Sequence, residues 1–81
     1  MNVDITKRQI DMKLLDSAIE AYKAENDCAK VYIFMNKETA EALTLSHDFK
    51  IFTNWSYSIF LYLENNVYID DNLKFGEVVI R

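Results

Sequence analysis

Residues 57–63 read Tyr-Ser-Ile-Phe-Leu-Tyr-Leu, and they carry the pattern that decides the fold class. Aromatic and β-branched residues of this kind favour an extended strand. Successive side chains of a strand point to opposite faces of its sheet. One face would carry Tyr57, Ile59, Leu61 and Leu63, and the other Ser58, Phe60 and Tyr62. We therefore expect a strand that is apolar on both faces.

The whole C-terminal half around this stretch is predicted to form strands joined by turns. The expected strands are residues 49–52, 57–63, 67–69 and 76–80, of which the first is a short additional one. The turns fall at residues 53–56, 64–66 and 70–72. Asn65 and Asn66 are expected in the hairpin turn because asparagine tolerates positive φ, and Gly76 is expected at a bulge.

A helix is predicted for the N-terminal third of the chain. Thr6 and Gln9 have the spacing of a capping box, with Thr6 as the N-cap. An apolar stripe follows at helical spacing: Ile10, Leu14, Leu15, Ala18, Ile19 and Tyr22. This long helix is expected to run for about five turns and to end near residues 25–27, with Asn26 as a left-handed cap.

A buried strand and a second helix are predicted between this helix and the C-terminal strands. Residues 31–35 read Val-Tyr-Ile-Phe-Met, a short continuous apolar run that is typical of a buried strand. Asn36 is expected to cap a shorter helix that has Glu38 in its first turn and ends near residues 46–48. The element order is then α-β-α-β-β-β. We expect one α+β domain over residues 1–81, with a mostly antiparallel sheet of four to five strands and helices packed on one face.

The length and composition of the chain limit how stable the fold can be and indicate where the protein is expected to be located. A chain of 81 residues supports only one core, and burial then barely exceeds the entropy cost of folding. Cys28 is the only cysteine, so an internal disulfide is impossible and a reducing, cytoplasmic location is expected. Cys28 and His47 are also the only strong soft metal ligands, which disfavours structural zinc. Association with another subunit remains as the way to stabilise so small a fold.

Charge and composition also argue against several classes of partner. The net charge of −4 and the scattered positions of the nine basic residues disfavour binding to nucleic acid or to an anionic membrane. Stacking of single-stranded nucleic acid on the aromatic rings is disfavoured because it normally needs a basic groove. No apolar run reaches about 18 residues, so no transmembrane helix is expected, and residues 1–13 lack the apolar core of a signal peptide. A single glycine excludes a glycine-rich phosphate loop, and no cofactor is expected.

Two groups of side chains are candidates for catalysis. Cys28 and His47 are the one nucleophile–base pair, but nothing in their local sequence marks them as catalytic, and we expect a semi-buried thiol and a surface imidazole. Asp70, Asp71 and Glu77 leave open the alternative of a carboxylate–metal hydrolase. Asp70 and Asp71 are adjacent and would point to opposite faces of a strand, so a solvated acidic turn is expected instead. We predict no catalytic, cofactor-binding or metal-binding residue and no enzymatic activity.

The aromatic side chains are the main functional signal of the sequence. In a two-layer fold, one sheet face meets the helices and the other meets water, yet the predicted strands are apolar on both faces. Exposed aromatic patches mark protein contacts, so the predicted interface residues are Tyr32, Phe34, Phe60 and Tyr62. The prediction is a non-enzymatic interaction or assembly module that forms a homo-oligomer, with a dimer favoured, or binds another protein. Two alternatives stay open: both faces are covered within the chain, or the protein is an acidic regulator of a nucleic-acid-handling protein.

Three further segments carry a resemblance to known proteins. Residues 33–39 read Ile-Phe-Met-Asn-Lys-Glu-Thr, residues 66–73 read Asn-Val-Tyr-Ile-Asp-Asp-Asn-Leu, and residues 76–80 read Gly-Glu-Val-Val-Ile. This order resembles the C-terminal part of tailed-phage major capsid proteins of the HK97-like fold, where a strand, Met-Asn and a helix precede a Gly-x-x-Val-x-x-Asp-x-x-Leu-Pro segment and a final strand. It also looks like small uncharacterised proteins of phages and bacterial mobile elements. The resemblance covers about half of the chain and departs from the family at Asn66 and Lys74. It implies a phage or mobile-element origin and self-assembly.

Overall fold

The computed structural model describes residues 1–6, 11–46, 48–53, 56 and 58–81. In these residues the chain forms two helices and six strands, in the order β-α-β-α-β-β-β-β. The strands are β1 (Asn2–Asp4), β2 (Tyr32–Met35), β3 (Phe49–Thr53), β4 (Ser58–Tyr62), β5 (Asn65–Ile69) and β6 (Glu77–Ile80), and the helices are α1 (Met12–Asn26) and α2 (Lys37–Leu43). The predicted α+β class is confirmed.

The six strands join one mixed sheet in the order β1-β6-β2-β5-β4-β3. β2 and β5 run parallel, and the other neighbouring strands run antiparallel. The predicted four to five mostly antiparallel strands are therefore right in outline, but β1 and the parallel pair were missed. β1 is too short for a periodic pattern and is fixed by its register with β6, in which Val3 lies opposite Val78. The parallel pairing sets Phe34 opposite Tyr68, a long-range match that local periodicity does not encode.

α1 is shorter than predicted because its N-cap is Asp11 rather than Thr6. The Asp11 carboxylate accepts a hydrogen bond from the Leu14 N–H at 3.1 Å. This bond satisfies one of the N–H groups that the first turn of a helix leaves free. Gln9 of the predicted capping box and Ile10 of the predicted stripe lie outside the described residues.

The apolar stripe of α1 and its C-terminal end lie close to the prediction. Leu15 and Ile19 are fully buried in the core. The helix ends at Asn26, whose side-chain amide donates to the Tyr22 carbonyl at 2.9 Å. The left-handed residue is Asp27, with φ of 48°, and not Asn26.

α2 begins as predicted but ends earlier than expected. The Asn36 side chain is its N-cap and accepts hydrogen bonds from the N–H and the hydroxyl of Thr39, at 2.7 Å and 2.6 Å. The helix ends at Leu43, which is buried, before the expected end near residues 46–48.

The β4–β5 hairpin turn is made by Leu63 and Glu64, not by the asparagines that follow. Both residues have positive φ, 49° and 65°, as a two-residue hairpin turn of type I′ requires. Asn65 instead belongs to β5 and is buried. Its amide donates to the carbonyls of Tyr62 and Leu63, and its side-chain oxygen accepts from the Val31 N–H at 3.1 Å. The amide side chain therefore ties the start of β2 to this turn.

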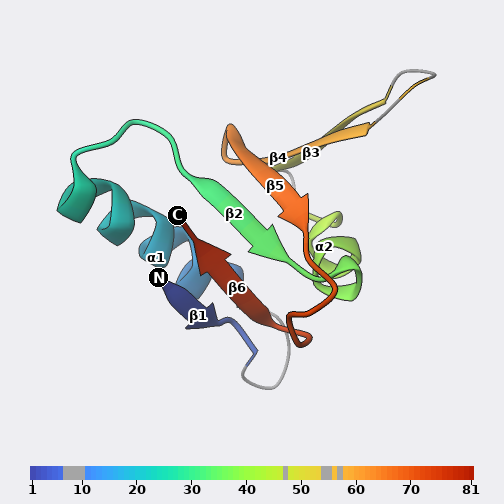
Figure 1. Cartoon of the computed structure of the whole chain (residues 1–81), viewed down its shortest axis with the longest axis horizontal. Coiled ribbons are helices and arrows are strands. Elements are labelled where there is room, and N and C mark those ends of the chain that lie inside the picture. The colour runs from blue at the N-terminus through green and yellow to red at the C-terminus, as the bar shows by residue number, and fades with distance from the viewer. Residues whose placement is uncertain (7–10, 47, 54–55, 57) are drawn as a thin grey trace.

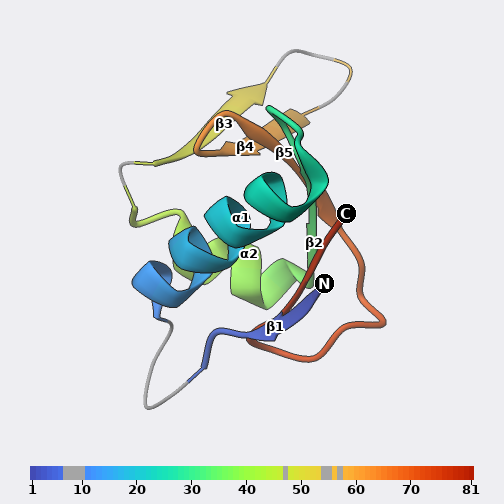
Figure 2. The same ribbon diagram turned by 90° about the vertical axis from the view of Figure 1, so that its left-hand side faces the viewer.

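Both helices lie on one face of the sheet, as Figures 1 and 2 show. The core forms between the helices and the sheet. Fully buried side chains of both layers build it: Leu15 and Ile19 of α1, Leu43 of α2, and Ile33, Met35, Val78 and Ile80 of the sheet. We call the opposite side the open face of the sheet. Among the described residues, neither helix has the length and apolar character needed to cross a membrane.

Candidate protein interface

The sheet separates the four predicted interface residues into two pairs on opposite faces. Tyr32 and Phe34 lie on the open face, because the residues that alternate with them on β2 are buried against the helices. Phe60 and Tyr62 lie on the helix side, because the β4–β5 register sets Tyr62 opposite the buried Asn65. The four residues therefore do not form one surface.

Tyr62 is a core residue, and the expectation that it belongs to an interface is wrong. Its side chain is fully buried, and its hydroxyl donates to the Asp16 carboxylate of α1 at 2.6 Å. Burial first, and then the bond to Asp16, raise the pKa of the Tyr62 phenol well above its usual value. A large ring with one satisfied polar end suits this position between β4 and α1.

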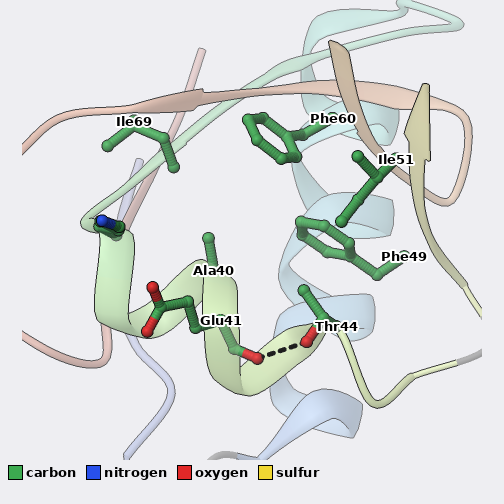
Figure 3. Close-up of a pocket in the computed structure, with 8 residues that line it drawn as sticks. Ala40, Glu41, Thr44, Phe49, Ile51, Phe60 and Ile69 are labelled. Atoms are coloured by element: carbon green, nitrogen blue, oxygen red, sulfur yellow. Dashed lines mark hydrogen bonds between the residues drawn. The ribbon is translucent and has the colours of Figure 1, made fainter. Parts of the chain in front are cut away.

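Phe60 lies in the wall of a pocket on the helix side of the sheet. It is half-buried, and its ring lies 6.1 Å from the ring of Phe49, centroid to centroid. The pocket has a volume of 320 Å³ and lies between α2 and the side chains of β3, β4 and β5 (Figure 3). It is lined by Lys37, Ala40, Glu41, Thr44, Phe49, Ile51, Phe60 and Ile69.

Tyr32 and Phe34 join a third aromatic residue, Tyr68, on the open face. The Phe34 and Tyr68 rings stack at 5.5 Å, and the Tyr32 and Tyr68 rings lie 6.1 Å apart. The guanidinium of Arg81 lies 5.1 Å from the centre of the Phe34 ring. Tyr32 is 53% exposed and Tyr68 46% exposed. We call this cluster, together with Val79 beside Phe34, the aromatic face.

The aromatic face has opposite charges on its two sides. Val79, Phe34 and Tyr68 lie opposite one another on β6, β2 and β5, so they form a row across the strands. On one side of this row, Arg81 pairs with Tyr32 through two backbone hydrogen bonds of 2.7 Å and 2.9 Å. On the other side, Glu77 of β6 lies opposite Asp4 of β1. Acidic residues thus lie on one side of the row, and Arg81 enters from the other side, with its guanidinium over the Phe34 ring.

The outer half of the β3–β4 hairpin is a second apolar surface. Ile51 is 49% exposed, Phe52 54% and Ile59 41%. The pairing of β4 with β5 stops at Phe60, and Figure 1 shows the hairpin extending away from the rest of the sheet. A pocket of 200 Å³ lies where β4 and β5 separate, between Ile59 and Tyr68.

The candidate catalytic residues are not gathered in a site among the described residues. The Asp70 carboxylate accepts from the Asn72 N–H at 3.0 Å, and the Glu77 carboxylate from the Lys74 N–H at 3.3 Å, so both are bound within the β5–β6 loop. Asp71 is exposed. In the described part of the chain, no three His, Cys, Asp or Glu side chains are grouped to hold a metal ion.

The structure describes one residue of the predicted nucleophile–base pair. Cys28 is half-buried between α1 and β2, as expected, and His47 lies outside the described residues. No protein-family model, no curated protein and no solved structure matches the chain.

Proposed function

We propose that this protein is a non-enzymatic interaction module that self-associates through the aromatic face. One observation carries the proposal: Tyr32, Phe34 and Tyr68 form a contiguous cluster on a sheet face that neither helix covers. Isolated exposed apolar residues are ordinary, but contiguous aromatic clusters mark protein contacts. Tyrosine and phenylalanine are also enriched in the cores of interfaces.

The area of the cluster is large enough to matter for so small a domain. An aromatic side chain buries 150–250 Å² when fully covered, so the half-exposed Tyr32 and Tyr68 each offer roughly 100 Å². At about 25 cal/mol per Å², covering both would contribute about 5 kcal/mol before the entropy cost of association. A gain of this size is comparable to the total stability of a small domain.

The charges beside the cluster favour a second copy as the occupant. A two-fold axis along the row of Val79, Phe34 and Tyr68 would exchange the two sides of that row. Arg81 of one copy would then face Glu77 and Asp4 of the other, and the reverse pair would form by symmetry. Such an isologous contact is the commonest kind in homodimers, and packed sheets adopt aligned arrangements of this type.

Among the described residues, the carboxylates of the hydrolase alternative are not grouped in one site. Asp70 and Glu77 each accept an N–H bond within the β5–β6 segment, and in the described chain they do not join a third acidic, His or Cys side chain in a metal site. Self-assembly is also what the resemblance to phage capsid proteins implies, and an origin in a phage or mobile element is part of the proposal.

Light scattering coupled to size exclusion tests the proposal at tens to hundreds of micromolar protein. We expect Tyr68→Glu to weaken self-association at least tenfold, about 1.4 kcal/mol, because a carboxylate would be buried without a partner in the contact. Phe75→Glu is the matched control, since Phe75 is also 46% exposed but lies in the β5–β6 loop. A wild-type protein that stays monomeric over this range, or equal effects of the two changes, would contradict the proposal.

A further inference from the structure

β3 lies at the edge of the sheet but has the composition of a strand with neighbours on both sides. It reads Phe-Lys-Ile-Phe-Thr, and both Ile51 on the helix side and Phe52 on the open side are about half exposed. Edge strands are usually protected by charges, proline, bulges or short length. β3 pairs with β4 over all five residues without a bulge, and the ammonium of its one charged residue, Lys50, is bound to Glu64 at 2.6 Å. These features leave the edge of β3 open to another strand.

At its outer end, which carries Phe52 and Ile59, the β3–β4 hairpin has no third strand beside it in the described chain. Ile59 and Phe52 pair with each other beyond the last β4–β5 pair, so this end has two strands instead of three. Two-stranded hairpins are marginally stable alone, and further strands or a covering helix are needed to stabilise them. An added strand along β3 would supply that support.

The backbone of β3 has a defined set of outward hydrogen-bonding groups. The Leu63 N–H donates to the Asp48 carbonyl at 3.0 Å. Hydrogen-bonded and non-hydrogen-bonded pairs alternate in antiparallel strands, so Lys50 and Phe52 direct their backbone groups to β4. Ile51 and Thr53 direct theirs outward. Phe49 has an outward carbonyl, while its N–H donates to the Ser46 carbonyl at 3.2 Å.

We propose that a second copy of the chain pairs with β3 in antiparallel orientation, about a two-fold axis at Ile51. In this register Ile51 exchanges both backbone hydrogen bonds with Ile51 of the partner copy. The Thr53 N–H donates to the Phe49 carbonyl of the partner copy, so the Phe49 N–H that is already bound to Ser46 is not needed. Four backbone hydrogen bonds then join the two strands, and the Thr53 carbonyl, which faces that Phe49 N–H, is left to solvent.

The side chains are compatible with the same register. Lys50 lies opposite Phe52 of the partner copy on the open face, so like charges are not placed opposite each other. Lysine can also interact favourably with the face of an aromatic ring. On the helix side, Ile51 meets Ile51 of the partner copy next to the pocket of Figure 3, which Ile51 already lines. Both exposed apolar residues of β3 are covered in this way.

This inference rests on the proposed self-association and adds a second contact to it. The aromatic face and the β3 edge use different residues, and each forms its own two-fold contact. Two different two-fold contacts on one chain build an assembly larger than a dimer. The protein would then join its copies both face to face and edge to edge.

Four proteins, compared by light scattering, test both contacts: the wild type, Ile51→Lys, Tyr68→Glu and the double variant. We expect an assembly larger than a dimer for the wild type, dimers for each single variant and a monomer for the double variant. Ile69→Lys is the matched control, because Ile69 is 40% exposed but lies on the inner strand β5, and it should leave the mass unchanged. Ile51→Pro is the second edge variant, since proline removes only an outward N–H and is tolerated on edge strands; circular dichroism checks that each variant folds.

The outcomes separate the two proposals. If the wild type is a dimer that Tyr68→Glu disrupts and both Ile51 variants leave intact, the β3 contact is overturned and the aromatic contact stands. If the Ile51 variants give monomers and Tyr68→Glu has no effect, the β3 contact stands and the aromatic contact is overturned. A monomeric wild type overturns both.

Discussion

Tyr62 shows how one side chain joins the two layers of this fold. Its hydroxyl bond to Asp16 links β4 to α1, and both the burial of the ring and this bond hold the phenol in its neutral form. Tyr62→Phe should lower the free energy of unfolding by about 1 to 2 kcal/mol, because a hydrogen bond to a charged group is lost. Tyr32→Phe is the control, since the Tyr32 ring lies on the open face, and it should change stability by less than about 0.5 kcal/mol. Urea denaturation measures both, and equal effects would contradict the role assigned to Tyr62.

The same residue makes a prediction about pH. The folded-state pKa of Tyr62 is raised above its unfolded value near 10, so the folded protein keeps the proton that the unfolded chain releases. The contribution of Tyr62 to stability is therefore complete below pH about 10 and decreases as the pH rises above this value. The difference in unfolding free energy between wild type and Tyr62→Phe should shrink above pH 10. A difference that grows with pH would show that the pKa shift has the opposite sign.

The elements differ in how far their limits follow from local sequence. The α1 stripe and the Asn36 cap of α2 were predictable, because helical spacing and N-cap chemistry act over a few residues. The hairpin turn was not, because Asn65 forms its bonds to β2 and to the turn only after the strands have assembled. The sequence pattern correctly placed Phe60 and Tyr62 on the same face of their strand. Whether this face or the opposite one meets the helices depends on the sheet register, which the strand alone does not encode. Tyr68 lies in the predicted strand 67–69, yet only the parallel pairing with Phe34 places it in the cluster.

The end of α1 gives a prediction at the scale of the element. Asp27 is exposed and has a left-handed backbone, a conformation that costs less for glycine. Asp27→Gly should therefore raise the free energy of unfolding by about 0.5 to 1 kcal/mol. Glu25→Gly places the same residue inside the last helical turn and should lower it by about 1 kcal/mol. Thermal unfolding compares the two, and changes of the same sign would contradict the assigned helix end.

At the scale of the whole molecule, the two helices cover only one side of a six-stranded sheet. The buried core takes up Tyr62 and the other fully buried side chains of that side. The aromatic residues on the other side have no cover within the described chain. The central claim is that a second copy covers them, with Val79, Phe34 and Tyr68 along the symmetry axis.

Isotope-filtered NMR on an equal mixture of labelled and unlabelled protein tests this claim most directly. Nuclear Overhauser effects between copies report pairs of protons that are close across the contact. We predict effects between copies from the rings of Phe34 and Tyr68 and from the methyl groups of Val79, and their loss in Tyr68→Glu. A self-associated sample in which these three side chains give no effect between copies would contradict the account.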